Sequence, residues 1–180
     1  MLKLTGLTLA LALTAVPAIA QTPPPPPPAE AKMQAMPYVM AAGMSDLYEI
    51  NSSQIALQKS QNAGVRKFAQ MMIDHHQKTT AATMKAAKAA GLTPMPPTLD
   101  AGATASINEL QTASAADFDR LYIGQQGPAH QAALDLHQSY ASGGDKAPLR
   151  ASARAAVPIV KQHIAMLAKL NKGAGMAGGM

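Results

Sequence analysis

Residues 68–77 have the sequence FAQMMIDHHQ and lie inside a segment, about Ala63 to Ala90, whose pattern predicts one long amphipathic helix. Residues at three- and four-residue steps, Val65, Phe68, Met72, His75 and Thr79, form one stripe along this helix, and Met84 falls close to the same stripe. The stripe is apolar until it reaches the histidine. A single histidine on a core-facing stripe is more often a hydrogen-bonded core residue than a metal ligand. The ligand interpretation therefore needs partners elsewhere in the chain.

Residues 1–20 have the features of a secretory signal peptide. Lys3 precedes an apolar run from Leu7 to Val16, and Ala18-Ile19-Ala20 forms an A-x-A cleavage pattern. The apolar run is too short to cross a bilayer comfortably. We therefore expect cleavage after Ala20, no transmembrane segment in the mature chain, and a periplasmic or secreted protein.

Composition excludes several classes of site. The chain has no cysteine, which excludes disulfides, thiolate metal sites and cysteine nucleophiles. The formal net charge is +5, but the basic residues are scattered along the chain, and aromatic residues make up only 3% of it. Nucleic-acid binding needs a clustered basic surface and aromatic side chains for base stacking, so we expect no nucleic-acid partner.

The mature chain divides into a Pro-rich linker at residues 21–36, a helical domain at 37–171 and a flexible Gly/Met tail at 172–180. The proline run from Pro23 to Pro28 favours an extended polyproline II spacer. Helical patterns cover about Pro37–Ser60, Ala63–Ala90, Ala101–Thr112, Ser114 or Ala115–Gly143, and Ala147–Leu170. With no period-2 strand pattern, the sequence predicts an all-α fold: an antiparallel four-helix bundle with one extra short helix between helices 2 and 4.

Several details of these helices are also predicted. The first helix has an apolar side formed by Met40, Met44, Leu47, Ile50 and Leu57, and Glu49 lies beside that side. Gly91 is expected to cap the end of the second helix. Two prolines inside later helices, Pro128 and Pro158, are expected to kink them.

Each long helix offers one candidate metal ligand near its inner side: Glu49, His75, His130 and His163. Helical bundles build metal sites from such inward side chains on facing helices. Three imidazoles and a carboxylate suit zinc, copper, iron or nickel. The Glu-x-x-His pattern of di-iron carboxylate proteins is absent, because Met72, Gly127 and Val160 stand three residues before the histidines. His76 and His137 are weaker candidates, and we expect His76 at the surface or rim.

Methionine is frequent, and Met33, Met36, Met40 and Met44 recur at helical spacing. Thioethers bind Cu(I), so an exported protein rich in methionine and histidine is able to buffer copper. Methionine also fills irregular cores, and core packing is the interpretation we favour.

Three motifs, in this order and spacing, resemble the signature of the bacterial "domain of unknown function 4142" family. They are Phe68-Ala69-x-x-Met72-x-Asp74-His75, then Phe118-Asp119-x-x-Tyr122 with His130, and Pro158-x-x-x-x-His163. The resemblance covers about Tyr38 to Leu170. It implies an exported protein of the ferritin-like helical superfamily, with a biochemical role that is largely unassigned. The family's recurring glutamate and histidines map onto Glu49, His75, His130 and His163.

The sequence leads to one main functional hypothesis and two alternatives. The main one is an exported ferritin-like bundle that binds a metal ion (zinc, copper or iron) between its helices and acts in metal handling or envelope stress protection. The first alternative is a non-enzymatic module of the cell envelope, with structural histidines and another envelope protein as its partner. The second is a metal-dependent oxidoreductase. No catalytic residue is predicted, because no nucleophile motif such as G-x-S-x-G is present.

Overall fold

The computed structural model describes residues 22–177, with side chains through Lys172, so the predicted signal peptide and the last tail residues lie outside the described part. Within it the chain is all-helical and has no strand. A short 3-10 helix, η1 (Ala29–Lys32), precedes five α-helices: α1 (Ala35–Lys59), α2 (Ala63–Ala89), α3 (Ala101–Thr112), α4 (Phe118–Gly143) and α5 (Ala147–Ala177). The last helix thus continues beyond its predicted end at Leu170 and includes part of the predicted tail.

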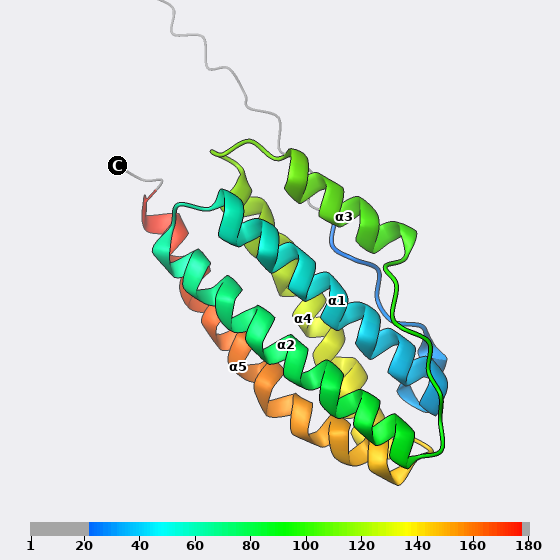
Figure 1. Ribbon diagram of the computed structural model, residues 1–180. Coiled ribbons are helices and arrows are strands. Elements are labelled where there is room, and N and C mark those ends of the chain that lie inside the picture. Colours follow the sequence, from blue (N-terminus) through cyan, green and yellow to red (C-terminus); the bar gives the residue numbers. More distant parts are fainter. Residues whose placement is uncertain (1–21, 178–180) are drawn as a thin grey trace, which may run out of the picture.

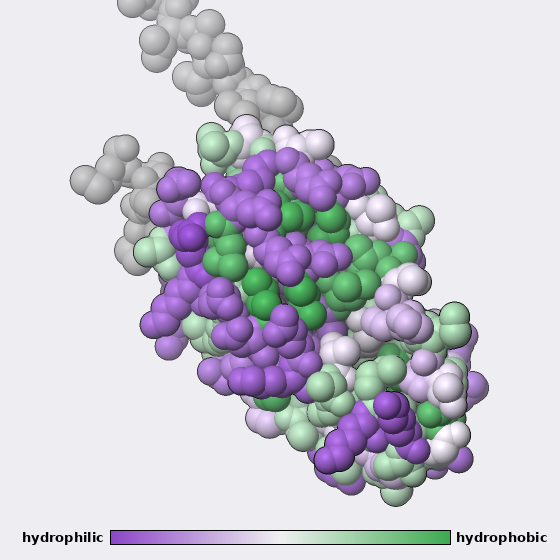
Figure 2. All heavy atoms as spheres, viewed as in Figure 1, coloured by the Kyte–Doolittle hydropathy of each residue, from purple (hydrophilic) through white to green (hydrophobic). Residues whose placement is uncertain are grey.

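The four long helices lie side by side, and α3 lies outside them against α1 (Figure 1). Helix α1 packs against α2 and α4, and α5 packs against the same two helices, so the four enclose a common interior. Hydrophilic side chains cover much of the face seen in Figure 2, with smaller hydrophobic areas between them. Among the described residues, no helix combines the length and the apolar character needed to cross a bilayer.

Local sequence signals define both ends of α2. The Asn62 side chain accepts hydrogen bonds from the backbone N–H groups of Gly64 and Val65, which would otherwise be unpaired at the first turn. At the other end Gly91 has a φ of +76°, the left-handed conformation that glycine adopts without a steric penalty. The backbone N–H of Leu92 then bonds the carbonyl of Ala87. The predicted capping role of Gly91 is confirmed.

The side of the first helix predicted to face the core is not the buried side of α1. Met40, Met44, Leu47, Ile50 and Leu57 are all only partly buried. The buried side of α1 instead carries small and polar residues: Ala35, Ala41, Ala42, Asp46, Glu49, Ser52, Ser53 and Ala56, with Tyr38, Val39, Tyr48 and Ile55. Small residues let helices approach closely. Three of the polar side chains, those of Asp46, Ser52 and Ser53, have hydrogen-bond partners on other helices; Ser53, for example, bonds the Tyr122 hydroxyl at 2.8 Å.

The Pro-rich segment predicted to be a spacer contacts the helical domain in the part that the structure describes, from Thr22 onward. The Ser106 hydroxyl of α3 donates to the Thr22 carbonyl at 2.7 Å. Pro25 packs so closely on Gly102 that a Cβ at that glycine would lie 2.7 Å from the Pro25 Cδ. Ala31, in η1, is fully buried. A polyproline II segment makes no hydrogen bonds of its own, and here the Thr22 carbonyl before the proline run and the ring of Pro25 within it both contact α3.

Two apolar clusters fill the interior, one toward each end of the long helices. The first includes Phe68, Met72, Phe118, Tyr122 and Leu167, and the second includes Tyr38, Leu136, Tyr140 and Leu149. Between them, on all four helices, the buried positions are polar: Asp46, Glu49, His76, His130 and His163. Burying polar groups costs free energy unless they are paired, so this polar layer requires a chemical explanation.

The neighbouring leucines of α4 test which face of this helix is buried. Leu136 is fully buried in the second cluster, whereas Leu134 is partly buried. We expect Leu136→Ala to lower the free energy of unfolding by about 2–5 kcal/mol and Leu134→Ala to lower it by clearly less. Urea unfolding followed by circular dichroism measures both. Equal losses in the two variants would contradict this orientation of α4.

Candidate metal centre

Three histidines from three helices converge in the polar layer. His76 of α2, His130 of α4 and His163 of α5 each offer one ring nitrogen, and these three nitrogens all lie within 4.8 Å of one another. The three residues, called the His cluster below, are 4%, 1% and 0% exposed. A buried cluster of three imidazole nitrogens at this separation is able to hold a metal ion.

The orientation of His76 is set by an acidic residue of α1. Its Nδ1 lies 2.7 Å from Asp46 Oδ1, so Nδ1–H donates to the carboxylate. Asp46 is itself held in place, because it accepts hydrogen bonds from the hydroxyls of Thr79 (3.1 Å) and Thr80 (2.7 Å). His76 Nε2 is buried and has no hydrogen-bond partner among the described residues. A neutral His76 therefore has the lone pair of Nε2 available.

The orientation of His130 is set by its own helix. Its Nδ1 lies 2.8 Å from the backbone carbonyl of Gln126, and a carbonyl only accepts, so Nδ1 carries the proton. Nε2 of a neutral His130 then has a free lone pair. Helix α4 is continuous through Pro128, and that proline does not prevent His130 from pointing inward.

His163 links the cluster to a fourth histidine. Its Nδ1 lies 3.2 Å from His130 Nε2, and its Nε2 lies 2.9 Å from Nδ1 of His75. His75 is only partly buried and stands outside the three converging nitrogens. His163 therefore lies between His75 and His130.

Electrostatics favours neutral imidazoles at two of the three positions. Burial lowers the pKa of His130 to about 3 and that of His163 to about 2, so both rings are neutral at pH 7. Burial also lowers the pKa of His76, but the hydrogen bond and charge of Asp46 and the charge of Glu49 outweigh it, and the pKa is raised. A proton and a metal ion therefore compete for His76 Nε2.

Glu49 lies beside the cluster in the same polar layer. It is 1% exposed, its Oε1 lies 3.7 Å from His130 Nδ1, and its Oε2 has no hydrogen-bond partner among the described residues. Burial raises the pKa of its carboxyl to about 7. Its oxygens are not part of the converging group, so the structure brings Glu49 near the histidines without placing it among them.

Of the four predicted ligands, the structure brings His130 and His163 together, places Glu49 beside them and puts His75 behind His163. The ligand set itself stays a prediction. The surface or rim position predicted for His76 is wrong, because this residue is buried in the cluster. The buried stripe of α2 passes through Val65, Ala69, Met72, His76, Thr83 and Ala87. Two of these positions, Ala69 and Ala87, are fully buried alanines, so a search for large apolar residues alone does not locate the buried stripe.

His137 belongs to a different contact. Its Nδ1 lies 3.0 Å from the Tyr38 hydroxyl, and its ring meets the Tyr38 ring edge-on. Burial lowers its pKa to about 4. His137 is therefore a buried, neutral histidine with a structural partner, and it serves as a comparison for the three cluster histidines.

A family model described as "Domain of unknown function (DUF4142)" matches residues 20–170. No curated protein and no solved structure matches the chain.

The buried neutral histidines predict loss of stability in acid for the metal-free protein. The unfolded chain binds a proton at each histidine near pH 6.5, whereas folded His137 resists protonation down to about pH 4. The contribution of His137 to the free energy of unfolding is therefore complete above pH 6.5 and decreases as the pH falls, by about 2 kcal/mol between pH 7 and pH 5.

We expect His137→Phe to remove this part of the pH dependence, as measured by urea unfolding at both pH values in the presence of a chelator. His76, with its raised pKa, acts in the opposite direction in both proteins, so the comparison isolates His137. The same pH dependence in the variant and the wild type would contradict a neutral buried His137.

Proposed function

The chain belongs to the DUF4142 family, and from this premise we propose that it is an exported, ferritin-like four-helix bundle that binds a transition-metal ion between its helices. The proposed ligands are His76 Nε2, His130 Nε2 and His163 Nδ1. The proposed role is metal handling or envelope stress protection in the periplasm, without a di-iron oxidase centre.

The observation that carries this proposal is the unpartnered Nε2 of His76. A buried polar atom without a partner costs about 1–3 kcal/mol. Here the other nitrogen of the same ring is fixed by Asp46, so the ring is not free to turn toward a different partner. A metal ion among the three nitrogens supplies the missing partner.

The outer contacts of two cluster histidines support the same proposal. Metal-bound histidines generally donate their second ring N–H to a carboxylate or a backbone carbonyl, which fixes the tautomer and the ring orientation. His76 donates to the Asp46 carboxylate, and His130 donates to the Gln126 carbonyl. Both arrangements leave Nε2 as the ligand atom.

The spacing and the donor types restrict the ion. Metal–nitrogen bonds of about 2.0–2.1 Å in a tetrahedral site put two ligand nitrogens about 3.3 Å apart. The 3.2 Å between His130 Nε2 and His163 Nδ1 is close to that value. Imidazole nitrogens without thiolates suit zinc, copper or iron. A divalent ion would also balance the buried charge of Glu49, which is therefore the candidate for a fourth ligand or a counter-charge.

One observation favours the alternative, a non-enzymatic envelope module with structural histidines. His163 lies within hydrogen-bond distance of both His130 and His75, so a chain of imidazole hydrogen bonds accounts for these three rings without an ion. These hydrogen bonds leave His76 Nε2 without a partner among the described residues, which is why metal binding is the function we favour.

Metal-binding measurements on single variants separate the two functions. We expect the purified mature protein, stripped of metal, to take up about one equivalent of Zn²⁺ or Cu²⁺. His76→Ala, His130→Ala and His163→Ala should each weaken binding by more than the roughly 10–100-fold loss typical of an outer contact. Glu49→Gln keeps the shape but removes the charge, and should weaken binding about tenfold. Competition with a chromogenic chelator measures all of these affinities.

The matched control is His137→Ala, which removes a buried histidine outside the cluster and should keep the wild-type affinity. Circular dichroism checks that each variant is helical. If the wild type takes up no zinc, copper or iron, or if the His76 variant binds metal as the wild type does, the proposed metal site at the His cluster is wrong. The envelope module with structural histidines is then the better explanation.

A further inference from the structure

His75 is the one histidine beside the cluster whose role the proposed site leaves open. We propose that it is a positioning residue: it accepts the Nε2–H of His163 and thereby directs His163 Nδ1 toward the metal ion. This inference rests on the proposed function, and it replaces the ligand role predicted for His75.

The geometry places His75 directly behind His163. Its Nδ1 lies 2.9 Å from His163 Nε2, on the side of the ring opposite to the His130 contact. The two ring planes are nearly parallel, at an angle of 21°, and their centroids are 5.2 Å apart, as expected for rings that meet edge to edge in an in-plane N–H···N hydrogen bond. Because His163 is fully buried, no water competes for its Nε2.

The hydrogen bond to His75 determines which nitrogen of His163 is able to bind the metal ion. A neutral imidazole has one proton, so His163 presents a lone pair at Nδ1 only when the proton is on Nε2. A buried N–H needs an acceptor, and His75 Nδ1 is the acceptor within reach. Without this acceptor, the proton is better placed on Nδ1, where it donates to His130 Nε2 and blocks both lone pairs.

His75 completes a pattern among the three cluster histidines. The outer nitrogen of each ring faces one defined partner: the Asp46 carboxylate for His76, the Gln126 carbonyl for His130 and the His75 ring for His163. The first two partners are acceptors by nature. The third is an acceptor only in the tautomer that carries its own proton on Nε2.

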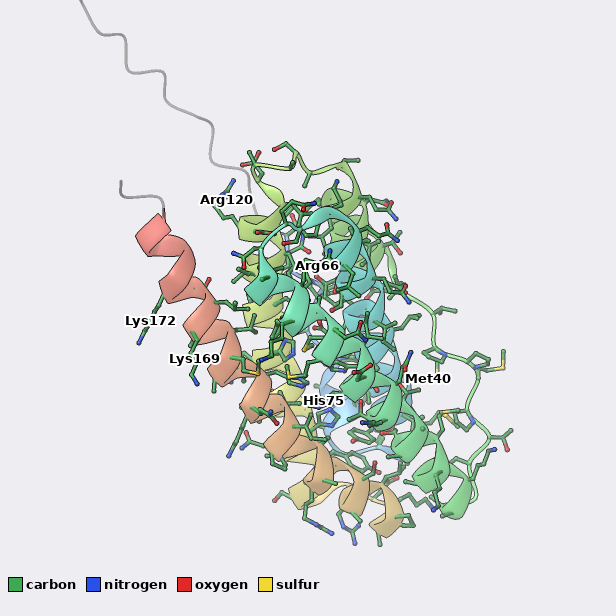
Figure 3. The ribbon with its side chains drawn as sticks, turned by 60° about the vertical axis from the view of Figure 1, so that its left-hand side comes forward. Met40, Arg66, His75, Arg120, Lys169 and Lys172 are labelled. Carbon is green, nitrogen blue, oxygen red and sulfur yellow. The ribbon has the colours of Figure 1, made fainter. Side chains whose placement is uncertain are left out.

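The position of His75 at the edge of the interior allows that tautomer. It lies midway along the contact between α2 and α5 (Figure 3). These two helices run in opposite directions: Gly64 near the start of α2 lies beside Leu170 late in α5, and Thr83 late in α2 bonds Ser152 early in α5. The side chain is partly exposed, so water is able to accept a hydrogen bond from its Nε2–H group. When an ion binds, His163 and His75 each carry a single proton on Nε2, and neither ring changes its charge.

The test uses Zn²⁺ as the probe, with two substitutions of His75 and one control. His75→Ala removes the acceptor and should weaken Zn²⁺ binding about 10–100-fold. His75→Asn puts an amide oxygen near the position of Nδ1 and should restore binding to within a few-fold of the wild type. His137→Asn removes a histidine elsewhere and should have no effect.

A second readout reports the tautomer itself. In the ¹⁵N spectra of the Zn²⁺-loaded wild type, His163 should be bound through Nδ1 and protonated at Nε2, and His75 should be protonated at Nε2. If His75→Ala binds with wild-type affinity, or if His163 binds zinc through Nε2, the inference is overturned while the site stands. A wild-type protein that takes up no Zn²⁺ overturns the site and the inference together.

Discussion

The hydrogen bond between Asp46 and His76, 2.7 Å long and buried, is the interaction on which the interior of this protein depends. It joins α1 to α2 through two side chains that would be costly to bury separately, because each would lose its hydration without gaining a partner. The hydroxyls of Thr79 and Thr80 hold the carboxylate in place, so the imidazole has one orientation. As a consequence, its second nitrogen is buried in the interior and has no hydrogen-bond partner among the residues that the structure describes.

The rest of the interior is arranged around that nitrogen. Apolar clusters above and below supply the burial that stabilises the helices, and they keep water away from the polar layer between them. The layer contains a carboxyl group, Glu49, whose pKa burial raises to about 7, and two histidines whose neutral form burial favours. A divalent ion at this place would favour the charged form of the Glu49 carboxyl, and the neutral ring nitrogens are able to act as its donors.

The sequence was sufficient for the helices and insufficient for the contacts between them. The cap signals at Asn62 and Gly91 are local, so the bounds of α2 were predictable. His75 and His76 are adjacent and differ by about 100° of helix rotation, so a small error in the position of the stripe exchanges them. The residue that decides between them, Asp46, belongs to a different helix, and only packing brings it to His76.

The most direct test of the account is a crystal structure of the Zn²⁺-loaded protein with anomalous scattering data collected at the zinc edge. The account predicts one strong anomalous peak in the interior, about 2.0–2.1 Å from His76 Nε2, His130 Nε2 and His163 Nδ1. Helices α1, α2, α4 and α5 should keep their present packing around it. A peak only at surface residues, or an interior ion bound by His75 in place of His76, would contradict the account.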